Sequence, residues 1–130
     1  MADNSNADRE NEANMKSITI TLPLPPSINA SYRVGNGRFY QSEEAKQWLA
    51  DAYILLRQQW KEPPTKARIG LVIRWYFKRE ADISNRLKIV EDAMQRVIYE
   101  NDKQIYQEVQ FKFYDKVNPR VEIVPEEMFT

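Results

Sequence analysis

The sequence predicts an α+β fold, a two-layer sandwich in which a mixed sheet of about five to six strands packs against two main helices. Several short stretches alternate apolar and polar residues with the period of two that is typical of half-buried strands. Two other stretches repeat apolar residues every three or four positions, as amphipathic helices do. These stretches follow one another in the order strand, hairpin, helix, strand, helix, strand, strand, without an internal repeat.

Composition limits the chemistry that the chain can perform. A length of 130 residues fits one domain with a real core, and the net charge of zero gives no sign of nucleic-acid binding. No apolar run is long enough for a membrane span and no signal peptide is visible, so we expect a cytoplasmic protein without a membrane partner. Because cysteine and histidine are absent, disulfides, thiol nucleophiles, Ser–His triads and ordinary zinc sites are excluded. Any catalysis has to use carboxylates, lysine, hydroxyls or a hard metal ion.

The first third of the chain predicts a tail, a strand and a hairpin. Residues 1–16 are polar and poor in large apolar groups, so we expect a disordered tail before a domain over residues 17–124. Residues 17–22 alternate as a strand and end at a proline-rich run, which fits either a rigid connection or a ligand for a partner domain. The run Gly35-Asn36-Gly37 then predicts a hairpin, whose arginines and aromatic residues suit either nucleic-acid contact or ordinary cross-strand pairing.

A helix and the strongest strand of the chain follow the hairpin. Ser42 is expected to cap the helix, which has to end before Pro63 because proline cannot continue it. Residues 69–77 alternate along their whole length, which predicts a half-buried strand. The apolar spacing then becomes helical, so we expect a second helix over residues 84–98 with Ser84 as its N-cap.

The last third predicts two more strands. Residues 105–114 alternate apolar with polar side chains, and a short strand containing Val121 and Ile123 is expected after the turn at Asn118-Pro119. Residues 125–130 are expected to form a C-terminal tail.

Acids, a serine and a lysine gather where the strong strand meets the second helix. If the chain is still extended there, Asp82 and Ser84 point to one face, and Lys88 lies one turn further on. Asp102 returns just before the next strand. Carboxylates can hold Mg²⁺, which activates water, and a lysine can stabilise charge on a transferring phosphate, so the cluster suggests metal-dependent phosphodiester cleavage. The pattern also fits ordinary acids at a helix start and a Lys88–Asp92 surface pair, and the spacing leaves both interpretations open.

Three runs of this region resemble the RusA family of Holliday junction endonucleases, many of which are encoded by phages and prophages. They are Asp82-Ile83-Ser84-Asn85-Arg86-Leu87-Lys88, Glu91-Asp92-Ala93-Met94 and Glu100-Asn101-Asp102-Lys103-Gln104-Ile105. The opening from Leu22 to Arg33 also resembles the family, and the similarity spans roughly residues 17–124. The resemblance implies a RusA-like fold and a homodimeric endonuclease that resolves four-way junctions in branched DNA by paired phosphodiester cleavage. It also implies Mg²⁺ as cofactor, with Mn²⁺ as an alternative.

In that family aspartates bind Mg²⁺ and a lysine is catalytic. The resemblance therefore implicates Asp82 and Asp102 as metal ligands and catalytic residues, and Lys88 as a catalytic residue. Ser84 stands where the family has a second aspartate, so it is a weaker candidate ligand, and Asn101 replaces the first aspartate of the closing pair. Two carboxylates of the family pattern remain where three or more are usual, which bears on activity more than on fold.

Basic residues are concentrated beside this cluster. Residues 57–88 contain nine lysines and arginines and only three acids, which suits phosphate binding but also an ordinary solvated sheet face. Four residues are candidates for DNA contacts: Lys78, Arg79, Asn85 and Arg86. Two other functions stay open, namely a family member that binds branched DNA with little or no cleavage, and a small α+β interaction domain.

Overall fold

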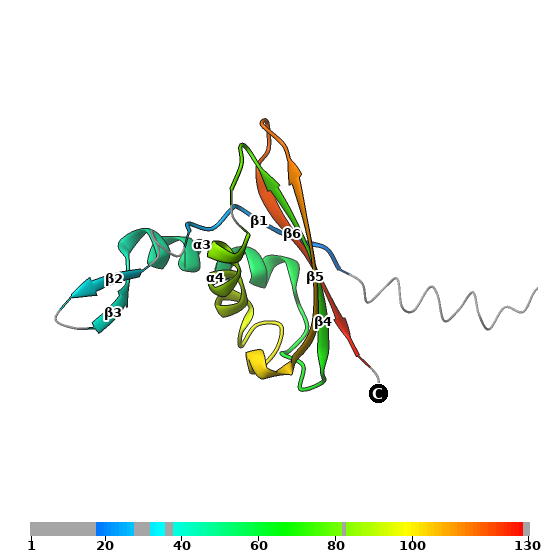
Figure 1. The fold of residues 1–130 in the computed structure, drawn as a ribbon. Coiled ribbons are helices and arrows are strands. Elements are labelled where there is room, and N and C mark those ends of the chain that lie inside the picture. Colours follow the sequence, from blue (N-terminus) through cyan, green and yellow to red (C-terminus); the bar gives the residue numbers. More distant parts are fainter. Residues whose placement is uncertain (1–17, 28–31, 36–37, 82, 129–130) are drawn as a thin grey trace, which may run out of the picture.

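The computed structural model describes residues 18–27, 32–35, 38–81 and 83–128, with side chains at all of these except 32–35, 38, 39, 84 and 85. In these residues the predicted α+β sandwich is confirmed, because a mixed sheet forms one layer and two helices form the other (Figure 1). Of the six strands in this part of the chain, four form the mixed sheet and two form a separate ribbon.

The main sheet has the strand order β1, β6, β4, β5. These strands are β1 (Ile20–Leu22), β6 (Arg120–Glu127), β4 (Ile69–Phe77) and β5 (Ile105–Tyr114). β4 pairs parallel with β5 and antiparallel with β6, and β6 also pairs antiparallel with β1. The ten-residue strand β5 therefore forms one edge of the sheet.

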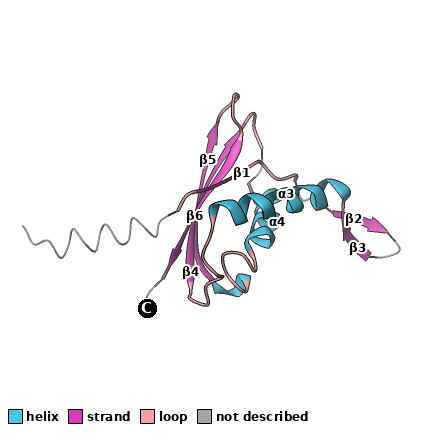
Figure 2. Ribbon diagram, turned by 180° about the vertical axis from the view of Figure 1, so that it is seen from behind, coloured by secondary structure: helices cyan, strands magenta, loops and turns pink. Residues whose placement is uncertain are grey.

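The helices are α3 (Glu43–Gln59) and α4 (Ser84–Met94), and a single turn of 3-10 helix, η1 (Asp102–Gln104), precedes β5. Both α-helices lie on the same side of the sheet, as the views from the front and from behind show (Figures 1 and 2). The ribbon of β2 (Tyr32–Gly35) and β3 (Arg38–Gln41) precedes α3. Among the described residues, no helix combines the length and the apolar character needed to cross a membrane.

The core lies between β4 and the helices. Alternate residues of β4 are buried on the helix-covered face, as the period of two predicts: Ile69, Leu71, Ile73, Trp75 and Phe77. α3 begins as expected, since Ser42 Oγ accepts a hydrogen bond from Ala45 N at 3.1 Å. The proline-rich segment is held against this helix, because Trp48 Nε1 donates to Pro23 O at 3.1 Å and Pro25 is buried. This packing favours a rigid connection for that segment.

The start and the end of α4 differ from the sequence prediction. Ser84 is the first residue of the helix rather than its N-cap, and the N-cap position is occupied by Ile83, which makes no side-chain capping bond. Ile83 has helical dihedral angles (φ −61°, ψ −46°), so the expectation of an extended chain is wrong at this residue. The helix ends at Met94 rather than near residue 98, because the chain reverses at Arg96, which has a φ of 71°.

The face of the sheet opposite the helices is partly apolar. The register pairs Val72 of β4 with Val109, Arg74 with Phe111 and Tyr76 with Phe113, and all of these lie on the open face. The rings of Tyr76 and Phe113 stack with their centroids 5.1 Å apart. The apolar side of β5 is therefore the exposed one, and its polar alternate residues turn toward the helices.

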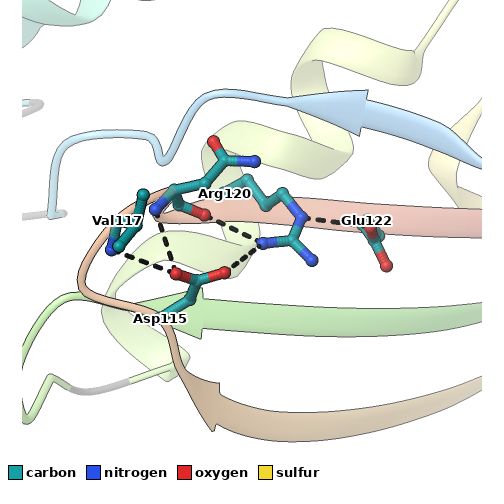
Figure 3. A network of polar contacts seen from close by, with 5 residues as sticks. Asp115, Val117, Arg120 and Glu122 are labelled. Carbon is teal, nitrogen blue, oxygen red and sulfur yellow. Dashed lines mark hydrogen bonds and ion pairs between the residues drawn. The ribbon is translucent and has the colours of Figure 1, made fainter.

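A polar network closes the turn between β5 and β6 (Figure 3). Asp115 Oδ1 accepts hydrogen bonds from the backbone nitrogens of Val117 and Asn118, both at 3.0 Å. Arg120 Nη1 donates to Asp115 Oδ2 at 2.9 Å, and its Nε donates to Glu122 Oε2 at 3.1 Å. The backbone bond from Asn118 and the bond from Arg120 lower the pKa of Asp115. The network holds the start of β6, whose pairing with β4 then continues as far as Glu127.

Candidate active site

Lys88 lies between two carboxylates from different elements. Its Nζ is 3.0 Å from Asp92 Oδ1, one turn along α4, and 3.9 Å from Asp102 Oδ2 in η1. The fold thus brings Lys88 and Asp102 together, as expected from the sequence, and it also forms the Lys88–Asp92 surface pair that was the alternative interpretation. Both pairings exist at once, so the surface pair does not exclude a functional role for the lysine.

Asp102 is held by a tightly bonded turn. Asn101 caps η1, since its Oδ1 accepts from Lys103 N at 2.9 Å, while Gln104 Oε1 accepts from Asn101 N at 2.8 Å. Gln104 Nε2 in turn donates to the carbonyls of Thr65 at 2.8 Å and Ala67 at 2.9 Å. Asparagine caps a helix about as well as aspartate, so replacement of the usual aspartate at position 101 keeps this turn intact.

Two half-buried carboxyl groups lie behind the lysine. The carboxyl groups of Glu91 of α4 and Glu108 of β5 are near enough to influence each other's ionisation, and Glu108 Oε1 is buried with no hydrogen-bond partner among the described residues. Burial, with the negative charge of Glu108 second, raises the pKa of Glu91 to about 7. Burial also raises the pKa of Glu108. The pair therefore retains a proton more strongly than exposed carboxyls do.

Tyr99 is a buried residue that contacts the backbone of Glu91. Its side chain is fully buried, and its hydroxyl donates to the backbone carbonyl of Glu91 at 2.6 Å. Burial, followed by the charge of Glu91, raises the pKa of Tyr99, so the phenol stays a neutral donor. This bond fixes the last turn of α4 against the connection that leads to η1.

The loop between β4 and α4 is tied to the far end of β5 through Glu80. Lys112 Nζ lies 2.8 Å from Glu80 Oε1, and the hydroxyl of Tyr114 donates to Glu80 Oε2. These hydrogen bonds, from Lys112 first, lower the pKa of Glu80. Glu80 is two residues before Asp82, so the tether acts on the segment that leads to a candidate metal ligand.

The remaining candidate residues are placed as follows. Asp82 lies outside the described residues, and Ser84 and Asn85 are placed in the first turn of α4 without described side chains. Lys78 and Arg79 are exposed just after β4. The guanidinium of Arg86 lies over the ring of Phe77, 5.4 Å from its centroid.

The donor groups of this region suit a hard divalent cation in kind, since they are carboxylate oxygens. The buried, unpartnered Glu108 Oε1 is such an oxygen. In the described part of the chain, however, no three acids are arranged so that they could hold a metal ion together. A complete metal site would need at least one more ligand, and Asp82, two residues before α4 in the sequence, is the candidate that the resemblance to the family implies.

Sequence reasoning missed Glu91 and Glu108 as members of the site. Glu91 stood in a run that resembles the family but received no role, and Glu108 was taken for a polar position of an alternating strand. Glu108 can be assigned to the site only when it is known which face of β5 the helices cover. The parallel register, which pairs Glu108 with Leu71, determines that face, whereas local alternation of apolar and polar residues does not.

Lys88, Asp92 and Asp102 meet at the surface of the sandwich and supply both cationic and carboxylate groups, the two kinds of group that reactions at phosphate use. Comparison with family models agrees, since the model for Endodeoxyribonuclease RusA matches residues 23–124. The chain therefore belongs to the RusA family, and the resemblance found in the sequence is confirmed. A comparison with curated proteins gave no match. Family membership indicates an endodeoxyribonuclease of the Holliday junction resolvase type, with branched DNA as its substrate.

Proposed function

We propose that this protein is a Mg²⁺-dependent endonuclease that resolves four-way DNA junctions by paired phosphodiester cleavage, with Mn²⁺ as an alternative metal. The observation that carries the proposal is the approach of Lys88 to Asp102, 3.9 Å apart, within the region that the family model matches. One acid and one lysine that are distant in sequence meet at the surface, where a phosphate can reach both of them.

Each residue has a distinct role in this proposal. Asp82 and Asp102 would hold the metal, with the Ser84 hydroxyl as a weaker third ligand. When bound, the metal would polarise the scissile phosphate and activate a water molecule. Lys88 would neutralise the charge that develops on that phosphate, while its bond to Asp92, at 3.0 Å, holds the ammonium near Asp102.

The flanking phosphates would be bound by basic and polar side chains around the start of α4. They are Lys78, Arg79, Asn85 and Arg86. Lys78 and Arg79 are exposed, which leaves both accessible to a strand that runs past the site. Contacts of this kind position the DNA without reading its sequence.

Two copies of the chain would act together. A four-way junction has two equivalent strands to cut, and a two-fold homodimer presents two equivalent catalytic centres. We therefore propose a homodimer in solution, which light scattering at micromolar concentration can test. A monomer under these conditions would contradict this part of the proposal.

The test of the whole proposal is a pair of binding and cleavage assays on synthetic four-way junctions, with and without Mg²⁺. The wild type should cut only with the metal. Asp82→Asn and Asp102→Asn should each abolish cleavage while binding is kept or tightened, because removal of a negative charge lowers the repulsion of phosphates. Asp51→Asn, at an exposed position of α3, is the matched control and should behave as the wild type.

The outcomes separate the proposal from its two alternatives. Binding by the wild type without cleavage in any divalent metal would indicate a junction-binding protein that has lost activity, and the replacement of family aspartates by Ser84 and Asn101 would then be the first explanation to test. Neither binding nor cleavage would indicate an interaction domain. Full cleavage by either aspartate variant would remove that residue from the site.

A further inference from the structure

Strand β5 forms an edge of the main sheet that no other described strand covers. It is ten residues long and contains no proline, and the irregularity in its pairing with β4 lies at its start. Its open face is apolar, since Val109, Phe111 and Phe113 are each between 38% and 43% exposed. A long, regular edge strand with an exposed apolar face is a template for pairing with another chain.

The backbone of β5 leaves its even-numbered residues able to pair outward. Asp115 N donates to Phe77 O of β4 at 2.8 Å, and the N–H and C=O groups of successive residues point to alternate sides of a strand. The odd-numbered residues of β5 therefore bond toward β4. Glu108, Gln110 and Lys112 present their backbone groups at the free edge, where an added antiparallel strand can bond to them without disturbing the sheet.

The sequence of β5 is complementary to itself about Gln110. When two copies of β5 pair antiparallel with Gln110 on a two-fold axis, position 108 lies opposite position 112, and position 109 lies opposite position 111. On the helix-covered face this places Glu108 opposite the partner's Lys112. On the open face it places Val109 opposite the partner's Phe111. Any other antiparallel register separates the two charges from each other.

The described contacts of the two charged residues agree with this pairing. Glu108 Oε1 is buried with no hydrogen-bond partner among the described residues, which is unfavourable for a carboxylate oxygen. Lys112 Nζ lies 2.8 Å from Glu80 Oε1, and an ammonium has three donors, so it can bind a second carboxylate while it keeps the first. Charges that point inward from an edge strand hinder pairing with most strands, but a matched pair of charges selects one partner in one register.

We propose that β5 joins a second copy of this chain across a two-fold axis at Gln110, so that two four-stranded sheets form one continuous sheet. The inference rests on the proposed function in one respect, that the protein is a homodimer. The partner's Lys112 then lies beside Glu108, behind the candidate site of each copy. Because the axis is perpendicular to the sheet, both candidate sites lie on the same face of the joined sheet, which suits paired cleavage of one junction.

The first experiment reverses these charges in the full chain and measures the oligomeric state by light scattering over micromolar concentrations without Mg²⁺. Glu108→Lys sets lysine against lysine, and Lys112→Glu sets glutamate against glutamate, so each variant alone should dimerise at least about tenfold more weakly than the wild type. An equimolar mixture of the two should recover the dimer, because both pairs are then opposite in charge. Glu126→Lys and Lys116→Glu make the same changes at exposed positions elsewhere and should behave as the wild type.

A cross-linking experiment tests the register without changing a charge. The chain has no cysteine, so an introduced thiol can form a disulfide only with another introduced thiol. Val109 and the partner's Phe111 form a non-hydrogen-bonded pair with Cα atoms about 4.5 Å apart, which is within the range of a disulfide. A mixture of Val109→Cys and Phe111→Cys should therefore form a covalent dimer of one chain of each kind under mild oxidation. Either variant alone should form far less.

Two results would overturn the inference. One is a mixture of folded charge variants that stays as monomeric as its components, and the other is a cysteine mixture that cross-links no better than either variant alone. Thermal unfolding shows whether each charge variant has kept its fold, and if one has not, the cysteine mixture decides.

The outcomes also distinguish this interface from the proposed function. If the wild type is a dimer and either mixture fails, only this interface is disproved. A monomeric wild type would disprove the interface together with the proposed homodimer. Metal-dependent cleavage of junctions is measured separately on the wild type, so its failure leaves the test of the interface intact.

Discussion

The Nζ of Lys88 in α4 lies 3.9 Å from Oδ2 of Asp102 in η1, across a connection that contains a residue with positive φ. The two side chains are 56% and 38% exposed, so water screens their attraction and the pair contributes little to folding stability. A contact of this kind can be rearranged at low energetic cost when a phosphate arrives. We therefore regard the pairing as a feature of the site rather than of the scaffold.

Lys88→Ala is expected to reduce rate far more than affinity. One cation among many contributes little to phosphate attraction, but a cation at the scissile phosphate acts mainly in the transition state. We expect a fall of about 10²–10³-fold in the single-turnover rate with nearly unchanged junction affinity. Lys103→Ala, next to Asp102 and exposed, is the matched control. An affinity that collapses while the saturating rate holds would show that Lys88 only binds DNA.

Glu91→Gln is expected to change how stability depends on pH. The pKa of Glu91 is raised from 4.5 to about 7, so the folded state holds this proton more tightly than the unfolded state. Glu91 therefore makes the wild type lose stability as pH rises from about 4.5 to 7, and a neutral glutamine does not. Without divalent metal, the variant should match the wild type near pH 4 and melt a few degrees higher at pH 8.

The control for this prediction is Glu126→Gln, at an exposed position near the end of β6. Thermal unfolding of the three proteins at several pH values in a chelating buffer gives the comparison. A difference between Glu91→Gln and the wild type that is the same at every pH would show that Glu91 does not ionise in this range.

Glu80→Gln and Tyr114→Phe test the tether between the β4–α4 loop and β5. The Glu80 side chain is 76% exposed, so loss of its bond to Lys112 should leave the melting temperature nearly unchanged. If the tether positions the segment before Asp82, each variant should lose on the order of tenfold in rate at low Mg²⁺ and recover at high Mg²⁺. Glu43→Gln, which breaks the exposed pair with Lys46, is the control. A Mg²⁺ titration that superimposes on the wild type would show that the tether has no role in catalysis.

Local sequence patterns were sufficient to predict most strands and helices, but they did not predict how the second helix begins or which face of each strand is covered. The period of two along β4 and the serine before α3 predicted a strand and a cap that the fold contains. The same rule failed at Ser84, because Ile83 already has helical dihedral angles and takes the cap position. Cap chemistry at that point depends on how the loop from β4 approaches the helix, which local sequence does not specify.

The candidate site was likewise predicted from the sequence only in part. Lys88 and Asp102 could be paired in advance because two separated motifs occur in the order that the family has. Glu108 could not, because β5 carries apolar residues on its open face and mostly polar residues on its covered face, opposite to the usual arrangement. Only the parallel pairing with β4, at the edge of the sheet, decides which side of β5 meets Glu91.

Ser84→Asp is expected to strengthen metal binding and to raise cleavage at low Mg²⁺. Position 84 is where the family usually has an aspartate, and serine leaves the proposed metal site one negative charge short. Mg²⁺ can keep an additional water in place of the missing carboxylate, at a cost in affinity. The restored carboxylate should therefore lower the Mg²⁺ concentration for half-maximal rate by roughly several-fold, with the rate at saturating Mg²⁺ little changed.

The fold should tolerate this substitution, because Ser84 begins α4 and aspartate in a first helical turn interacts favourably with the unpaired backbone N–H groups there. Ser84→Asn, which has nearly the size of aspartate but no charge, is the matched control. An unchanged Mg²⁺ titration for Ser84→Asp would mean that position 84 does not face the metal. An equal shift in both variants would mean that the carboxylate charge is not what strengthens metal binding. Loss of activity with the fold intact would mean that the serine hydroxyl has a role that a carboxylate cannot fill.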